Sequence, residues 1–222
     1  MKISASVYAA RETPLPELAQ ELEALGVDYL HVDCKADARV FEDIAVLKQQ
    51  SSLPVDLHVI APEIEPYWQR AVETRVDLLT YQYENLPEGF QLPGEAPFKV
   101  GLGIMSDTPI EALLPHRAHF DFALLMTTTP GQSGGRFDKR TFARLRQFNR
   151  LFPEKQVHVD GGITDEVSFI LRMSGVACVV SGSYLLGAPS LGIALRDMKG
   201  EPTSNSFKLS DFMLPREELD VL

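Results

Sequence analysis

The feature that most constrains the fold of this chain is a regular alternation between strand-like and helix-like segments. Short apolar segments typical of strands lie at residues 2–7, 27–33, 53–58, 76–81, 98–104, 120–126, 156–160 and 177–181. Segments with apolar side chains three or four positions apart, which predict helices, lie at residues 15–25, 40–50, 64–74, 109–114, 139–152 and 165–173. The strands are continuously apolar, as in a parallel sheet that helices cover. Eight strands alternating with helices predict a (β/α)8 TIM barrel.

The alternation is interrupted once, after the fourth strand. Residues 85–97 contain three prolines and two glycines, so this stretch cannot form a full-length helix, and we expect that helix to be reduced or absent. An open doubly wound sheet is the alternative fold, but the Gly-x-Gly-x-x-Gly turn that would favour it is not found after the first strand. We therefore predict a barrel over residues 1–196. Residues 197–222 should form a C-terminal extension packed on the barrel or on a neighbouring subunit of a homo-oligomer.

Composition narrows the classes of partner. The 222 residues suit a single barrel domain, and a content of 45% hydrophobic and 23% charged residues is that of a globular protein. The net charge of −10 gives no electrostatic reason to bind nucleic acid or an anionic membrane, so we expect a small-molecule partner. With no signal-peptide pattern and no apolar run of about 18 residues, we expect a cytoplasmic protein. Cys34 and Cys178 are predicted to be reduced thiols without a catalytic role.

Four polar side chains at the ends of predicted strands suggest a metal site. His31 and Asp33 lie one pleat apart on one face of the second strand, at its carboxyl end. His58 ends the third strand, and Asp160 ends the seventh. Active sites of (β/α)8 barrels lie at the carboxyl ends of the strands, so these side chains can surround one divalent ion, such as Zn, Fe, Mn or Co. The alternative is a set of unrelated core polar residues.

The other histidines carry weaker signals. His116 and His119 fall together in a loop outside this pattern, and we expect both to face solvent. His158 lies two residues before Asp160 on the seventh strand, so both side chains share one face. Two interpretations of His158 stay open: an inward residue behind the metal site, or a core residue.

Glycines that follow three consecutive strands predict a phosphate site. Backbone N–H groups bind phosphate where glycine lets the ligand approach them. The residues concerned are Gly134 and Gly135 after the sixth strand, Gly161 and Gly162 after the seventh, and Gly182 with Ser183 after the eighth. Barrels commonly bind phosphate in the loops after strands seven and eight. A phosphorylated sugar is therefore the expected ligand.

These stretches together resemble the ribulose-phosphate 3-epimerase family over residues 2 to about 190. Residues 2–7 resemble its first strand, which carries a substrate-contacting serine, here Ser6, and His31-Val32-Asp33 resembles its His-Val-Asp. Asp56-Leu57-His58 contains its second histidine, and residues 126–131 resemble its Met-Thr-Val-x-Pro-Gly loop. Val159-Asp160-Gly161-Gly162-Ile163 resembles its Val-Asp-Gly-Gly-Ile, and Gly182-Ser183 matches its last phosphate contact.

The resemblance implies a function and roles for individual residues. It implies a metal-dependent epimerase that inverts C3 of a ketose phosphate such as ribulose 5-phosphate, through an enediolate and without an organic cofactor. The implied metal ligands are His31, Asp33, His58 and Asp160, with Asp33 and Asp160 doubling as the two acid/base residues. Met126 corresponds to a methionine that caps the substrate of the family.

The chain departs from the family pattern beside the metal ligands. Lys35 and Ile60 replace two methionines that cap the substrate, Gln82 replaces a histidine of the fourth strand, and Gln132 lies in a changed loop after the sixth strand. If the second strand continues to Lys35, its side chain faces inward above the metal and contacts substrate; otherwise it is a solvated lysine.

These departures leave two alternatives open. Asp33-x-Lys35-x-Asp37 resembles the Asp-x-Lys-x-x-Asp of phosphate-binding decarboxylases and hexulose-phosphate synthases, but is one residue short. This suggests a sugar-phosphate lyase or decarboxylase that uses Lys35. The other alternative is a degenerate barrel that binds a phosphorylated metabolite without turnover, although two carboxylates in a metal site have little use in a pure binder.

Overall fold

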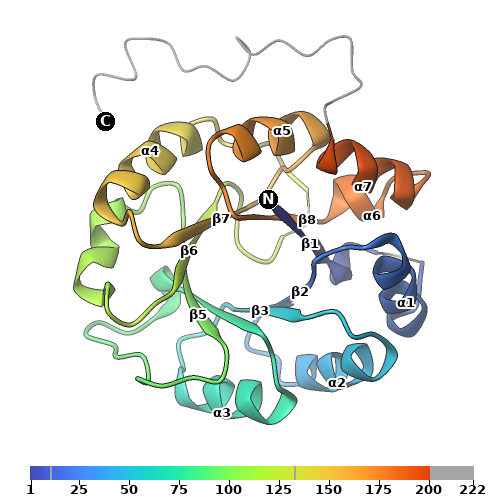
Figure 1. The fold of residues 1–222 in the computed structure, drawn as a ribbon. Coiled ribbons are helices and arrows are strands. Elements are labelled where there is room, and N and C mark those ends of the chain that lie inside the picture. The colour runs from blue at the N-terminus through green and yellow to red at the C-terminus, as the bar shows by residue number, and fades with distance from the viewer. Residues whose placement is uncertain (11, 133, 201–222) are drawn as a thin grey trace.

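The structure is a computed structural model that describes residues 1–10, 12–132 and 134–200. Eight parallel strands close into a barrel in which each strand pairs with its neighbours in chain order, so the predicted (β/α)8 barrel is confirmed (Figure 1). The strands are β1 Lys2–Ser6, β2 Tyr29–Cys34, β3 Val55–Val59, β4 Leu78–Gln82, β5 Lys99–Ile104, β6 Phe122–Met126, β7 Gln156–Asp160 and β8 Cys178–Ser181. Most residues of these strands are buried, because one face of the sheet packs against the helices and the other face points into the barrel interior.

Helices surround the barrel on its outer side (Figure 1). The α-helices are α1 Leu15–Leu25, α2 Val40–Gln50, α3 Glu65–Thr74, α4 Thr141–Leu151, α5 Asp165–Met173, α6 Ser183–Leu186 and α7 Leu191–Lys199. Three 3-10 helices are η1 Val7–Ala9, η2 Tyr83–Asn85 and η3 Ile110–His116. None of the helices in the described part of the chain is long and apolar enough to cross a bilayer.

The predicted loss of one outer helix is confirmed. Between β4 and β5 the structure describes only η2 and an irregular segment in which Leu92 is buried. Trp68 of α3 packs edge-on against Phe98, with ring centroids 4.9 Å apart, and covers part of this side of the barrel. The prolines and glycines of residues 85–97 explain the absence, since they disrupt helical hydrogen bonding.

The two groups of histidines outside the predicted metal site have different environments. His116 is half-buried and stacked on Phe90, with ring centroids 4.3 Å apart, so the expectation that it faces solvent is wrong. His119 is exposed, as expected. His158 is a buried core residue that stacks on Phe122 at 4.2 Å, and burial lowers its pKa to about 4.

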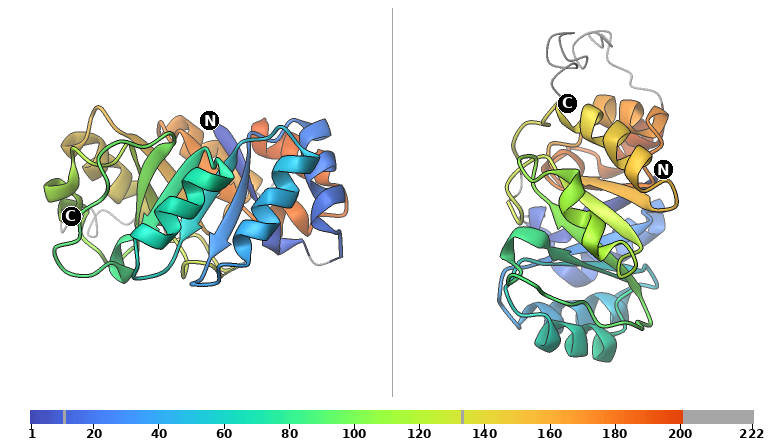
Figure 2. Two further views of the ribbon diagram at one scale, coloured as in Figure 1. Left: turned by 90° about the horizontal axis from the view of Figure 1, so that it is seen from below. Right: turned by 90° about the vertical axis from the view of Figure 1, so that its left-hand side faces the viewer.

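Strand register places the predicted site residues at one end of the barrel. Asp33 of β2 is paired with His58 of β3, and Met126 of β6 is paired with Asp160 of β7. In the side view at the left of Figure 2 the loops after the strands gather at the edge opposite the N-terminus. The predicted extension at residues 197–222 begins inside α7, and residues 201–222 lie outside the described part of the chain.

Candidate metal and phosphate site

Three of the four predicted metal ligands lie together at the carboxyl ends of β2 and β3. His31, Asp33 and His58 each offer one ligand atom, and these atoms lie within 4.8 Å of one another. Asp33 is at the centre, because its Oδ1 lies 3.4 Å from His31 Nε2 and 3.2 Å from His58 Nδ1. Both histidines are fully buried, whereas Asp33 is partly exposed to the cavities above it.

The outer nitrogen of each histidine is held by a different group. His31 Nδ1 lies 2.9 Å from Asp56 Oδ2, which also accepts a hydrogen bond from Ser4 Oγ at 2.9 Å. His58 Nε2 lies 2.9 Å from Gln82 Oε1. A hydrogen bond at one ring nitrogen fixes the orientation of the imidazole and leaves the other nitrogen for a metal. The two inner nitrogens therefore point toward Asp33.

The donor set fits a divalent transition metal. His58 Nδ1 is buried and has no hydrogen-bond partner among the described residues, a property it shares with Thr80 Oγ1. Buried polar atoms normally have a partner, and a metal ion beside Asp33 would supply one. Two imidazole nitrogens and a carboxylate are ligands that such ions prefer. Burial lowers the pKa of His31, but Asp56 and Asp33 outweigh it and raise that pKa, so an ion at Nε2 displaces a proton.

Asp160 lies near this group but outside it. It belongs to β7 and is separated from β2 by β8 and β1 around the barrel. Burial raises the pKa of Asp160 to about 6. Burial would also raise the pKa of Asp33, but the charge and the hydrogen bond of His31 bring it well below its usual range. The pKa values of the two carboxyl groups are thus shifted in opposite directions. That Asp160 is the fourth metal ligand remains a prediction.

The predicted phosphate residues line one cavity of about 290 Å³. This glycine-lined cavity is bounded by Gly134, Gly135, Gly161, Gly162, Gly182 and Ser183, together with Ser6, Asp33 and Asp160. The structure therefore brings together the residues that follow β6, β7 and β8. Met126 is buried against Leu124 and Val180 and is not among the lining residues.

Glycine is required in the loop after β7 because the loop after β6 packs directly on it. Gly161 and Gly162 have φ angles of 110° and 62°, in the left-handed region. A Cβ atom at Gly162 would lie 2.4 Å from the backbone nitrogen of Phe137. Among the hydrogen bonds of the described residues, none uses the backbone N–H of Gly162 or of Ser183. Both donors are available to a ligand in the cavity.

Sequence reasoning missed several residues of this cavity. Besides the predicted set it is lined by Gln132, Ile163, Thr164, Val180 and Tyr184. Gln132 and Ile163 lie in stretches that the sequence had marked, and Thr164 carries a signal as the cap of α5, whose side chain accepts a hydrogen bond from Val167 N. The others depend on how the loops fold over the strand ends.

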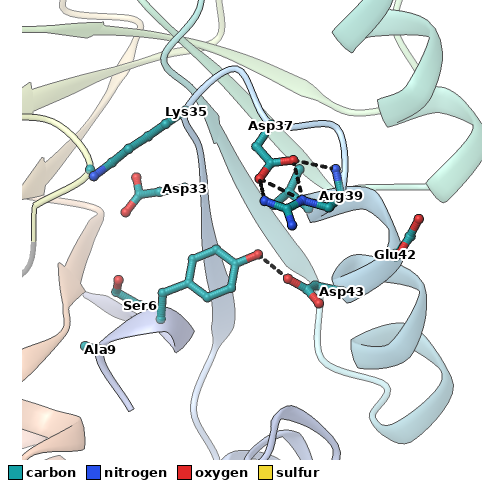
Figure 3. A pocket seen from close by; sticks show the side chains of 11 residues that line it. Ser6, Ala9, Asp33, Lys35, Asp37, Arg39, Glu42 and Asp43 are labelled. Carbon is teal, nitrogen blue, oxygen red and sulfur yellow. Dashed lines mark hydrogen bonds and ion pairs between the residues drawn. The ribbon is translucent and has the colours of Figure 1, made fainter. Parts of the chain in front are cut away.

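A second cavity, of about 640 Å³, opens beside the first and shares Ser6 and Asp33 with it. In Figure 3 the side chain of Lys35 extends above Asp33, and the ion pair between Asp37 and Arg39 lies on the other side of the cavity. We call this second cavity the outer cavity. Its outer wall also carries Asp43, which accepts a hydrogen bond from Tyr8 at 2.6 Å.

Lys35 lines the outer cavity and lies just beyond the end of a strand. Strand β2 ends at Cys34, and Lys35 is exposed, which differs from the inward strand position considered for it. Its side chain nevertheless crosses to the loop after β6, where a Cβ at Gly131 would lie 2.1 Å from Lys35 Cε. Among the described residues Lys35 forms no ion pair. Its ammonium group is thus unpaired near Asp33.

Comparisons with known proteins agree with this geometry. The model of the ribulose-phosphate 3 epimerase family matches residues 2–186. Ribulose-phosphate 3-epimerase of Bacillus subtilis is 24% identical over 90% of this chain and 99% of its own length. The enzyme of the same name from Aquifex aeolicus is 28% identical over 78% of this chain and 84% of its own length.

Similar solved structures support the fold alone. A phosphoribosyl anthranilate isomerase from Thermus thermophilus has a TM-score of 0.62 at 17% identity, covering 89% of this chain and 96% of the other. A 3-hexulose-6-phosphate synthase from Salmonella typhimurium has a TM-score of 0.63 at 15% identity, with the same coverage.

Proposed function

Because the chain belongs to the ribulose-phosphate 3-epimerase family, we propose that it is a metal-dependent epimerase that inverts C3 of a ketose phosphate such as ribulose 5-phosphate. The observation that carries this proposal is that the histidine and aspartate group meets the glycine-lined cavity at Asp33, with Asp160 on the wall of the same cavity. A phosphate held in the loops would place the carbons of the sugar between these two carboxyl groups.

Inversion at C3 needs one group on each face of the carbon, since a proton leaves from one face and another returns on the opposite face. Asp33 and Asp160 come from β2 and β7, with two strands between them, and both line the cavity. Asp33, with its lowered pKa, is suited to be charged, and Asp160, whose pKa is about 6, is suited to take up and release a proton close to neutral pH. Such a difference between two carboxyl groups supports a division into base and acid. In the reverse reaction the roles exchange.

The metal is proposed to be one divalent ion held by His31, Asp33, His58 and Asp160. When bound, it would supply Lewis-acid stabilisation of the negative charge that develops on the oxygen of the substrate carbonyl. Asp56 and Gln82 hold the two imidazoles in place from outside. No organic cofactor is part of the proposal.

The phosphate of the substrate is proposed to accept hydrogen bonds from the free N–H groups of Gly162 and Ser183. Gly134, Gly135, Gly161 and Gly182 border the same space and leave it open for the anion. Charged acceptors gain about 1.5–3 kcal/mol from each such hydrogen bond. Ser6 is proposed to contact the sugar, and its position in the lining of both cavities supports this.

The test is solvent deuterium exchange at C3. Purified protein would be loaded in turn with Zn, Fe, Mn or Co and incubated in D2O with pentulose and hexulose phosphates, and NMR would detect both deuterium at C3 and the epimer. We expect exchange with at least one ketose phosphate, at C3 and accompanied by epimer. Binding of these sugars without exchange under every metal would contradict the proposal and favour a barrel that only binds a phosphorylated metabolite.

A second candidate is a sugar-phosphate lyase or decarboxylase. The observation in its favour is that Lys35 reaches over Asp33 with an unpaired ammonium group, which could stabilise an enediolate left after loss of a carbon fragment. The same NMR experiment separates the two candidates, because a lyase gives products with fewer carbons than the substrate and an epimerase does not.

A further inference from the structure

We propose that Glu84 sets the tautomer of His58 through the side-chain amide of Gln82, and so keeps His58 Nδ1 unprotonated for the metal. The proposal rests on the metal site proposed above. It assigns Gln82 and Glu84, which the resemblance leaves without a role, as positioning residues for one ligand.

The three side chains form a continuous chain of hydrogen bonds. Gln82 is the last residue of β4, and its Oε1 lies 2.9 Å from His58 Nε2. Its Nε2 donates to Glu84 Oε2 at 2.5 Å. His58 and Gln82 are both buried, with exposed fractions of 0% and 1%, so solvent cannot replace these partners. The chain ends on the carboxylate of Glu84 in η2.

The direction of every hydrogen bond in this chain is dictated by the carboxylate. An ionised carboxylate only accepts, so Gln82 must turn its NH2 group toward Glu84. The carbonyl oxygen of the same amide then faces His58 and also only accepts, so His58 Nε2 must carry the proton. A neutral imidazole with a proton on Nε2 has a lone pair on Nδ1. This buried nitrogen lies 3.2 Å from Asp33 Oδ1 and has no hydrogen-bond partner among the residues that the structure describes.

Glu84 is itself anchored on its other side. Its Oε1 accepts hydrogen bonds from the backbone N–H of Met105 at 2.8 Å and from the hydroxyl of Thr108. Arg144 holds the same loop by donating to the carbonyl oxygens of Met105 at 3.0 Å and Thr108 at 2.7 Å. Because the Met105 N–H can only donate, this oxygen of residue 84 must always accept. A change of Glu84 to glutamine therefore has one consistent orientation.

The decisive variant is Glu84→Gln. Its amide oxygen would keep the contact with Met105, so its NH2 group would face Gln82 and force that amide to reverse. Gln82 would then present its NH2 group to His58 Nε2, which would have to accept, and the proton would move to Nδ1. We expect NMR of 15N-histidine-labelled protein at pH 8, with chelator present, to show the Nε2–H tautomer of His58 in the unaltered chain and the Nδ1–H tautomer in Glu84→Gln. Affinity for Zn, measured by chelator competition, should fall by about 10- to 100-fold.

Two further variants separate the relay from a general structural effect. In the double variant Gln82→Glu with Glu84→Gln, the new carboxylate accepts from both His58 and the new amide, so the Nε2–H tautomer and Zn affinity should both return. The control is Glu111→Gln, which removes the same charge from η3, where Glu111 accepts a hydrogen bond from Gln147 at 2.7 Å. It should change neither measurement.

The tautomer is read without metal or substrate, so this proposal and the proposed function can fail separately. An Nδ1–H tautomer in the unaltered chain, or an unchanged tautomer in Glu84→Gln, would overturn the relay whatever the metal measurements show. If the tautomers shift as expected but the unaltered chain binds no divalent ion, the metal role of the relay and the proposed function both fall.

Discussion

The two halves of the site are built from different parts of the chain. On the side of β2 and β3, chemistry comes from side chains on rigid strands, with His31, Asp33 and His58 within 4.8 Å of one another. On the side of β6 to β8, the proposed ligand donors are backbone N–H groups in loops where side chains are excluded, as at Gly162. We call these the metal half and the phosphate half. We therefore expect the metal half to be sensitive to side-chain chemistry and the phosphate half to be sensitive to side-chain size.

This comparison gives each half its own expected signature. Changes in the metal half should lower metal affinity and kcat, because they alter groups that act on the reacting carbons. Changes in the phosphate half should raise KM and leave metal content alone, because they alter binding of a group that does not react. Four substitutions test this separation, in order of decreasing expected effect.

The largest effect is expected for Asp33→Asn. It removes the carboxylate that lies between the two histidines and is proposed as one acid/base residue, so kcat should fall by at least about 1000-fold. Metal content after dialysis, measured by mass spectrometry, should fall as well. The matched control is Asp37→Asn, an exposed carboxylate four residues further on that pairs with Arg39. Equal losses in both variants would show that the loop, and not the ligand, controls the rate.

A smaller effect is expected for Asp56→Asn, which weakens the outer partner of His31. Loss of the charge should lower metal affinity by about 10- to 100-fold and leave KM unchanged at saturating metal. Chelator competition and steady-state kinetics measure the two quantities. Thr80→Val is the control, because Thr80 Oγ1 is buried beside His58 and has no hydrogen-bond partner within the described part of the chain. A raised KM with normal metal affinity in Asp56→Asn would contradict the separation of the metal half from the phosphate half.

In the phosphate half, Gly182→Leu should raise KM by about 10- to 100-fold, the loss of one charged hydrogen bond. The leucine would occupy space beside Ser183 where the phosphate is proposed to bind. Metal content should not change. Gly94→Leu is the control, since a Cβ at Gly94 has no neighbour within 4 Å. Loss of metal from Gly182→Leu would mean that the two halves are not separate.

The smallest effect is expected for Lys35→Met, in the outer cavity above Asp33. Removal of the unpaired cation should lower kcat/KM by about tenfold, roughly 1.4 kcal/mol of transition-state stabilisation. Metal binding should remain intact. Arg39→Met is the control, because Arg39 lines the same outer cavity but is already paired with Asp37. An unchanged rate in Lys35→Met would place this lysine among solvated surface residues.

The sequence predicted the metal half better than its surroundings. His31, Asp33 and His58 could be placed together because strand periodicity fixes the face of each side chain and the barrel aligns the strand ends. The glycines of the phosphate half were found because turns after strands are marked by residue type. In both cases local geometry determines the position.

What the sequence did not predict depends on rotamers and loop paths. The contacts of Gln82 with His58 and Glu84 require particular side-chain rotamers, which periodicity does not specify. Lys35 crosses to Gly131 after the strand has ended, so its direction follows the loop and not the pleat. His116, the last residue of η3, stacks on Phe90, which lies in a segment with no regular structure, and tertiary packing alone brings them together.

The central claim is that the metal half performs the proton exchange on a ketose phosphate held by the phosphate half. The most direct test is to strip the protein with chelator, add the divalent ion back in steps, and measure bound metal and deuterium exchange at C3 of ribulose 5-phosphate in the same samples. We expect stripping to abolish exchange, and exchange to rise in proportion to bound metal up to one ion per chain. Exchange that continues at its full rate in the stripped protein would contradict it.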